Sequence, residues 1–204
     1  QLGVMSNQGW IWFARCIAGS FILLAGFSLL LAETAGHGAT SKMKRIAKIL
    51  LAASAVSIAT YVVFPESYVY FGILHHIALA SLLAWPLLRM NSVVLVIIAI
   101  AVFAAHQSFA FEFANTRWWA WIGIGQEVPA TNDYVPLVPW FAIFLAGMIL
   151  GKTIVLQKRI IHILKENPAW IKPLIWMGRH SLPIYLLHQP VLFGIAYGVF
   201  TLSQ

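Results

Sequence analysis

The chain has 204 residues, of which 61% are hydrophobic and only 9% are charged. Soluble domains carry roughly 25% charged residues, because a surface that faces water needs them. This shortage, with a mean hydropathy of +0.84, excludes a soluble enzyme, a nucleic-acid-binding domain and a disordered chain. The single cysteine, Cys16, excludes a disulfide framework and a cysteine-based zinc site. The composition is that of an integral membrane protein.

Six apolar stretches are long enough to cross the roughly 30 Å hydrocarbon core of a bilayer as helices. A segment in lipid must satisfy its own backbone hydrogen bonds, and these runs lack the alternating pattern of barrel strands. The sequence therefore predicts an all-α polytopic membrane helical bundle, with residues 1–204 as one transmembrane domain. The expected helices cover residues 10–31, 46–64, 68–88, 92–111, 137–156 and 181–202.

The formal net charge of +7 is distributed unevenly among the loops. Most of the 13 basic residues lie in or beside the alternate segments 33–45, 89–91 and 152–179. The positive-inside rule places these segments in the cytoplasm and the C-terminus outside. The charge is therefore interpreted as a topology signal, with the lipid bilayer and not a nucleic acid as the expected partner.

This orientation makes the first helix run from outside to inside, so the chain would begin outside the cell. No cleavable signal peptide precedes Trp10. We therefore expect a further helix upstream of Gln1.

The outer loop 112–136 is rich in tryptophan, with Trp118, Trp119 and Trp121 close together. Tryptophans at the membrane surface usually anchor a protein to the interface. Stacking on a substrate is the alternative interpretation.

Ionisable side chains within spans are costly and are candidates for function. At about 1.5 Å rise per residue, Arg15, His75, His76 and His106 fall within roughly 10 Å of the outer surface. Asp133 enters the same layer from the loop before the fifth helix. A histidine can act as a base near neutral pH, and a neighbouring carboxylate can hold its tautomer.

A polar track continues from this layer towards the inner surface. His188 falls near the middle of the membrane, and Arg179, His180 and Ser181 fall at the inner end of the sixth helix. The alternative for each histidine is a structural hydrogen bond to a neighbouring helix. Because His75 and the next residue point about 100° apart, one of that pair is expected to be structural.

A second chemistry fits two of these histidines. His76 and His106, if they lie on neighbouring helices at similar depth, could ligate a b-type haem. The protein would then be a membrane cytochrome.

Four stretches, in order along the chain, carry a recognisable pattern. The first, 15–28, begins Arg-Cys-Ile-Ala-Gly-Ser-Phe, and the second, 71–80, contains two adjacent histidines. The third, 133–151, contains Asp-Tyr-Val-Pro, Pro-Trp-Phe and two glycines four apart, and the fourth, 178–190, is Gly-Arg-His-Ser-Leu-Pro-Ile-Tyr-Leu-Leu-His-Gln-Pro. Together they resemble the bacterial relatives of heparan-α-glucosaminide N-acetyltransferase. The last stretch is also similar to the end of wider membrane acyltransferases. The resemblance covers nearly the whole chain.

The resemblance implies a multi-pass protein of the bacterial inner membrane that moves an acetyl group from cytoplasmic acetyl-CoA to an extracytoplasmic, carbohydrate-like acceptor. No metal is expected. The residues to which it assigns roles are His75, His76, Asp133 and His188 as catalytic; Lys152, Arg179, His180 and Ser181 as binding the CoA phosphates; and Arg15, His106 and Trp140 as binding the acceptor.

The family carries an additional first helix, with an Asp-x-x-Arg-Gly pattern followed by a histidine-bearing stretch, before the region where this chain begins. Its absence here agrees with the upstream helix expected from the charges. It also leaves open a second function, as a non-catalytic accessory or structural subunit of a larger membrane complex. A homo-oligomer is the other assembly considered. A transporter is less favoured, because no paired broken helices mark a midplane substrate site.

Overall fold

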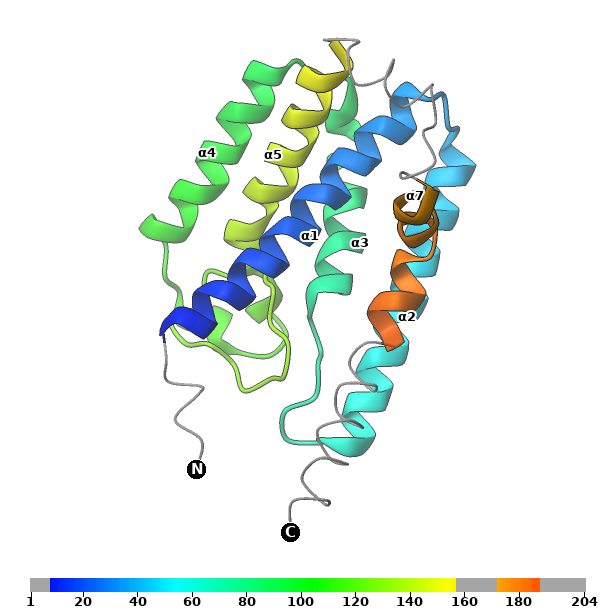
Figure 1. Cartoon of the computed structure of the whole chain (residues 1–204). Coiled ribbons are helices and arrows are strands. Elements are labelled where there is room, and N and C mark those ends of the chain that lie inside the picture. The colour runs from blue at the N-terminus through cyan, green and yellow to red at the C-terminus, as the bar shows by residue number, and fades with distance from the viewer. Residues whose placement is uncertain (1–7, 157–171, 188–204) are drawn as a thin grey trace. The chain divides into compact units, whose positions relative to one another are not determined.

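The computed structural model describes residues 8–156 and 172–187 (Figure 1). The chain folds as two units, Gln1–Gln157 and Lys158–Gln204. The first contains α1 (Gln8–Thr34), α2 (Ala39–Val63), α3 (Ile73–Ala84), α4 (Ser92–Ser108), α5 (Leu137–Leu156) and the 3-10 helices η1 (Pro86–Arg89), η2 (Glu112–Asn115) and η3 (Ala120–Ile122). The described part of the second contains α7 (Lys172–Arg179) and a further helical stretch at 181–187.

The predicted all-α membrane fold is confirmed. Helices α1 and α2, and residues 137–154 of α5, are long and apolar enough to cross a membrane. Helices α3 and α4 are apolar but shorter, with 12 and 17 residues. Of the sixth predicted helix, 181–202, only residues up to 187 lie within the described part, and these are helical.

The helix boundaries differ most from the predicted ones in α2 and α3. Helix α2 begins at Ala39 rather than at 46, because the basic residues that sequence analysis assigned to the loop continue the helix. Helix α3 is shorter at both ends, beginning at Ile73 and ending at Ala84. Pro86, which has no backbone N–H to continue the helix, follows its end and opens η1.

Close contact between α1 and α5 forms the centre of the first unit (Figure 1). A Cβ atom on Gly26 would overlap the Phe144 carbonyl, and one on Gly147 would overlap the Leu23 carbonyl. Membrane helices associate through such small residues, because lipid provides no hydrophobic drive between helices and close van der Waals packing must replace it. Fully buried side chains surround the contact: Ile22, Leu29, Leu30, Phe144, Leu145 and Met148.

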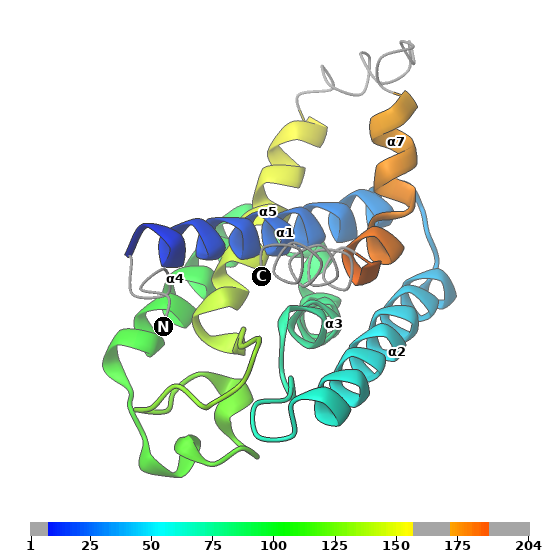
Figure 2. The same ribbon diagram turned by 60° about the horizontal axis from the view of Figure 1, so that its bottom comes forward.

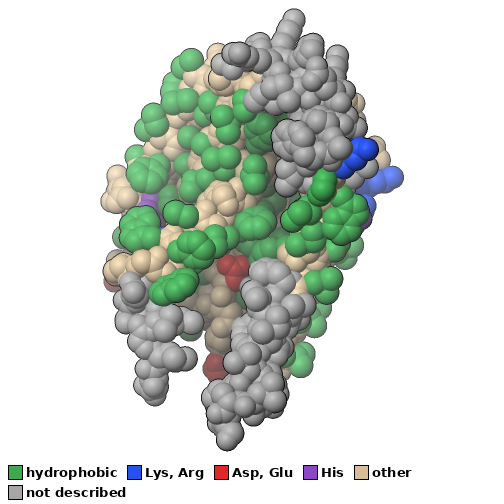
Figure 3. Space-filling view, in the orientation of Figure 1, with side chains coloured by type: hydrophobic (Ala, Val, Ile, Leu, Met, Phe, Trp, Pro, Cys, Tyr) green, Lys and Arg blue, Asp and Glu red, His purple; other side chains and the backbone are tan. Residues whose placement is uncertain are grey.

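The remaining helices pack around this pair. Helix α4 lies along α5, and α3 lies between α2 and the α1–α5 pair (Figure 2). Large apolar side chains stay exposed on the outer faces, among them Leu51 and Val62 of α2 and Val93 and Ile100 of α4. Figure 3 shows such side chains covering much of the visible face. An apolar exterior over helices of this length is what a bilayer requires.

The two ends of the first unit differ in chemistry, and Figure 1 shows which elements meet at each end. At one end, α1 and α5 finish, α2 begins and η1 joins α3 to α4; this basic end carries Lys42, Lys44, Arg89 and Lys152. The opposite loop end consists of segments 64–72 and 109–136, with η2 and η3. The alternate loops of the topology prediction thus gather at opposite ends of the unit.

Candidate functional site

At the loop end, two segments that are far apart in the sequence lie side by side. Phe71 and Tyr134 form a parallel β-bridge, in which Val135 N–H donates to the Phe71 carbonyl at 3.3 Å. Asn132 N–H donates to the Ser67 carbonyl at 2.9 Å. These backbone bonds fix segment 131–135 against the entry to α3, and they place Asp133 over the first turn of that helix.

The Asp133 carboxylate accepts a hydrogen bond from the backbone N–H of Ile73, with Oδ2 at 2.8 Å from the nitrogen. A carboxylate is favourable there, because the N-terminus of a helix carries partial positive charge. Gly72 makes the approach possible, since any Cβ at that position would overlap the carboxylate. Burial raises the pKa of the Asp133 carboxyl above its ordinary value, and the bond from Ile73 opposes part of that rise.

His75 is held by hydrogen bonds at both ring nitrogens. Its Nδ1 accepts from the Gly72 N–H at 3.3 Å, so the ring proton lies on Nε2, which is 3.3 Å from the Ser57 hydroxyl of α2. That hydroxyl donates in turn to the Val69 carbonyl at 2.6 Å. The chain of bonds defines a neutral imidazole that ties α3 to α2.

His76, the next residue, has the opposite character. Its side chain is 0% exposed, and within the described part of the chain neither ring nitrogen has a hydrogen bond. The backbone carbonyls of Val135 and Pro136 lie close enough to interact with the ring electrostatically, but not in hydrogen-bond geometry. Buried polar groups in proteins almost always have partners. His76 is therefore a buried group at this end whose ring nitrogens could bind a ligand.

The structure brings the predicted residues Asp133, His75 and His76 to one place. Among the described residues no hydrogen bond joins the carboxylate to either imidazole; its Oδ2 accepts from the helix N-terminus instead. The separation of the two histidines into one bonded and one unbonded ring fits the expectation that one of the pair is structural. Their catalytic roles stay predictions.

The predicted acceptor residues come from three different helices. Arg15 is exposed on α1, with its guanidinium 5.6 Å from the ring centre of Trp12. His106, in the last turn of α4, lies with Nδ1 3.3 Å from the Gly123 carbonyl, to which it can donate. Trp140 lies near the start of α5, and a Cβ on Gly19 of α1 would lie 3.8 Å from its ring.

The haem alternative required two histidines on adjacent helices. His76 lies on α3 and His106 on α4, and both views place α5 between these helices (Figures 1 and 2). The pairing of these two residues around one porphyrin is therefore not supported, because the helix that carries each ring packs against α5 rather than against the other.

The residues predicted to bind CoA belong to both units. Lys152 of α5 donates from Nζ to the Met90 carbonyl at the end of η1, so its ammonium stays at the basic end. In the second unit, His180 follows the last residue of α7, Arg179; its ring stacks on Trp176 with centres 4.6 Å apart, and Nδ1 lies 2.9 Å from the Trp176 carbonyl. Ser181 is exposed. His188 lies outside the described residues.

A cation–aromatic cluster that the sequence did not predict lies at the loop end. The Arg117 guanidinium lies 4.9 Å from the ring centre of Tyr68 and 5.6 Å from that of Tyr70. The hydroxyl of Tyr70 is buried, without a hydrogen-bond partner in the described part of the chain. The available signal was that Arg117 stands in a loop where the other charges are acidic. Its two tyrosine partners, nearly 50 residues away, could not be read from the sequence.

The neighbouring Tyr134 is held more firmly. Its hydroxyl donates to the Ala120 carbonyl of η3 at 2.6 Å. Burial, with a smaller contribution from the neighbouring Tyr70, raises the pKa of Tyr134 to about 12. Tyr134 is therefore neutral, and its hydroxyl joins segment 131–135 to η3 within the same loop.

An apolar helical exterior, a basic end and a buried polar cluster at the opposite end define a polytopic membrane protein with a candidate site at its loop end. The family model described as "Heparan-alpha-glucosaminide N-acetyltransferase, catalytic" matches residues 1–190. The chain belongs to this family, which confirms the resemblance inferred from the motifs. No curated protein and no solved structure matches the sequence significantly.

Proposed function

We propose that this protein moves an acetyl group from acetyl-CoA, bound at the basic end on the cytoplasmic side, to a carbohydrate-like acceptor at the loop end on the outer side. The observation that carries the proposal is the match of the acetyltransferase family to residues 1–190. The position of a polar, partly unsatisfied cluster at the end opposite the basic loops supports it.

The transfer breaks the thioester C–S bond and forms a C–N or C–O bond to the acceptor. The acceptor's proton must pass to a base, and the CoA sulfur leaves as a thiolate that takes up a proton to become the thiol. His76 fits the base, because neither of its nitrogens is committed to another group among the described residues. His75 fits a positioning role, because its Nδ1 bond to Gly72 and its contact with Ser57 fix the start of α3. Asp133 supplies negative charge beside the site.

Acceptor recognition fits the exposed side of the loop end. Aromatic rings such as Tyr68 and Trp140 offer flat apolar faces, and the Arg117 guanidinium can donate to acceptor oxygens without leaving its tyrosines. Arg15 offers a second cation on α1. This arrangement favours an acceptor with both apolar ring faces and oxygen-rich or acidic groups.

The CoA moiety fits the cationic residues predicted from the motif. Guanidinium and ammonium groups form charge-assisted hydrogen bonds with phosphate oxygens. Arg179 supplies a guanidinium, and Lys152 supplies an ammonium that its bond to Met90 already directs to the basic end. His180 and Ser181 can each add a hydrogen bond, from an imidazole N–H and a hydroxyl. His188 is the proposed contact along the acyl path.

The test is acetyl transfer by the full chain in proteoliposomes, with labelled acetyl-CoA and a panel of amino and neutral sugars outside. Loss of a general base reduces turnover by about 10²–10⁴-fold. We expect His76→Ala to show such a loss. The matched variant His37→Ala, in the exposed turn between α1 and α2, should keep wild-type turnover.

A second comparison separates chemistry from folding. His75→Ala should lower the unfolding temperature together with activity, whereas His76→Gln should retain the fold and lose activity. Full turnover by both His76 variants would overturn the role proposed for this histidine. No turnover by the wild-type chain with any acceptor, together with stable co-purification with another membrane protein, would favour an accessory subunit instead.

A further inference from the structure

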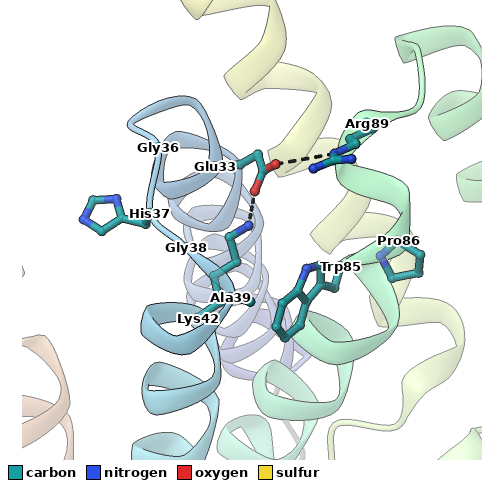
Figure 4. Close-up of a pocket in the computed structure, with 9 residues that line it drawn as sticks. All are labelled: Glu33, Gly36, His37, Gly38, Ala39, Lys42, Trp85, Pro86 and Arg89. Carbon is teal, nitrogen blue, oxygen red and sulfur yellow. Dashed lines mark hydrogen bonds and ion pairs between the residues drawn. The ribbon is translucent and has the colours of Figure 1, made fainter.

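A cavity of about 540 Å³ opens at the basic end of the first unit (Figure 4). It lies between the turn that joins α1 to α2 and the turn that joins α3 to α4. None of the residues predicted to bind CoA lines it. Its lining is Glu33, Gly36, His37, Gly38, Ala39, Lys42, Trp85, Pro86 and Arg89.

A buried ion pair forms one wall. The Lys42 ammonium bonds to Glu33 Oε2, and the two side chains are 8% and 25% exposed. The same ammonium lies 5.6 Å from the ring centre of Trp85, which faces it from the end of α3. Lys42 and Glu33 therefore largely neutralise each other, and they fix the cavity between two loops.

Arg89 carries the positive charge that the Lys42–Glu33 pair does not neutralise. Its side chain is 91% exposed, and its Nε lies 3.9 Å from Glu33 Oε1, at the edge of ion-pair distance (Figure 4). Such a contact at high exposure holds a guanidinium weakly. Most of its donors remain available to a second anion.

The N-terminus of α2 adds to the positive character of the cavity. Gly38 is the N-cap and has no side chain to bond the first backbone N–H groups, and Gly38 and Ala39 both line the cavity. A helix N-terminus is equivalent to roughly half a positive charge. With Lys42 and Arg89 against the single carboxylate of Glu33, the cavity favours an anion.

We propose that this cavity binds the phosphate group of an anionic phospholipid, with Arg89 as its main contact. Basic pockets at the cytoplasmic ends of membrane helices are suited to such headgroups. Exposed apolar side chains follow the two cationic ones in the chain, although neither lines the cavity itself: Met43 follows Lys42 and is 49% exposed, and Met90 follows Arg89 and is 40% exposed. These neighbours suit acyl chains, whereas a soluble phosphate compound would gain nothing from them.

The test is native mass spectrometry of the full chain, released from micelles that contain dioleoyl phosphatidylglycerol or phosphatidylcholine. We expect preferential retention of phosphatidylglycerol. Removing one basic contact at an anionic lipid surface weakens binding about fivefold, so Arg89→Ala should lose about that much. Lys44→Ala removes the same charge from an exposed position of α2 that does not line the cavity, and it should bind as the wild type does.

The outcomes separate the lipid from its competitors. Equal binding by Arg89→Ala and Lys44→Ala, or equal retention of both lipids, would overturn the proposal. Displacement of phosphatidylglycerol by millimolar free CoA or inorganic phosphate would show that the cavity serves a soluble phosphate instead. Unfolding temperatures measured in lipid-free detergent should be the same for both variants, because Arg89 is exposed, and lipid binding is read without any acetyl transfer.

Discussion

Replacement of Gly147 by alanine tests the packing that holds α1 against α5. A methyl group there would overlap the Leu23 carbonyl and would lie 3.0 Å from the Phe27 nitrogen, both of which are backbone atoms of α1. Backbone cannot move aside as a flexible side chain can, so overpacking should cost about 1–3 kcal/mol or more. Gly19→Ala is the matched control, because its methyl would meet only the Ile143 and Trp140 side chains at 3.8 Å, an ordinary contact distance.

Both variants gain the same helix propensity, about 1 kcal/mol for Gly→Ala, so the difference between them isolates the overpacking. For a chain of this length, about 1–3 kcal/mol corresponds to roughly 2–12 °C in unfolding temperature. The assay is thermal unfolding in detergent, followed by tryptophan fluorescence. We expect Gly147→Ala to unfold below Gly19→Ala by that margin. Equal unfolding temperatures would show that the two helices do not approach as closely as described.

Two further predictions concern charges, and a third concerns topology. Burial raises the pKa of Asp133 above 3.8, so the contribution of this group to stability is full below about pH 4 and is lost as pH rises through the raised value. The unfolding temperature of Asp133→Asn should therefore be no lower than that of the wild type at pH 7, and it should vary less with pH. A large loss of stability in this variant would contradict the argument. Lys42→Met should lower the free energy of unfolding by about 1–3 kcal/mol. This is less than the roughly 3–5 kcal/mol typical of a fully buried ion pair, because Glu33 is 25% exposed. Adding Glu33→Gln should restore most of the loss, and additive losses in chemical unfolding would show that the two side chains do not interact. In a background without the native cysteine, Trp118→Cys should react with a membrane-impermeant maleimide on intact cells and Lys44→Cys should not. The reverse labelling pattern would show that the protein has the opposite orientation in the membrane.

The helical architecture was largely predictable from the sequence because lipid imposes simple rules on span length and charge. Helix α5 agrees with the predicted range 137–156. Helix α2 begins earlier because the bond between Lys42 and Glu33 lets a basic turn remain helical near the membrane. That bond depends on the return of the chain after α1, which local composition does not encode.

Three residues of the candidate site could be placed together from the sequence, but their bonding could not. The sequence placed His75, His76 and Asp133 in one layer, and helix periodicity separated the two histidines. It could not show that the carboxylate binds the N-terminus of α3, because that contact needs segment 131–135 to pair with segment 67–72. The Arg117 cluster was missed for the same reason, since tertiary pairing of loops decides it.

The most direct test of the proposed function is a sided transfer assay. The full chain is reconstituted in one orientation, labelled acetyl-CoA is supplied at the basic end, and an amino sugar is supplied at the loop end. The proposed function predicts labelled acetyl sugar in the loop-end compartment, and its loss in His76→Gln. Acetylation of sugar only when it shares the compartment of acetyl-CoA, or none under either arrangement, would contradict transfer across the membrane.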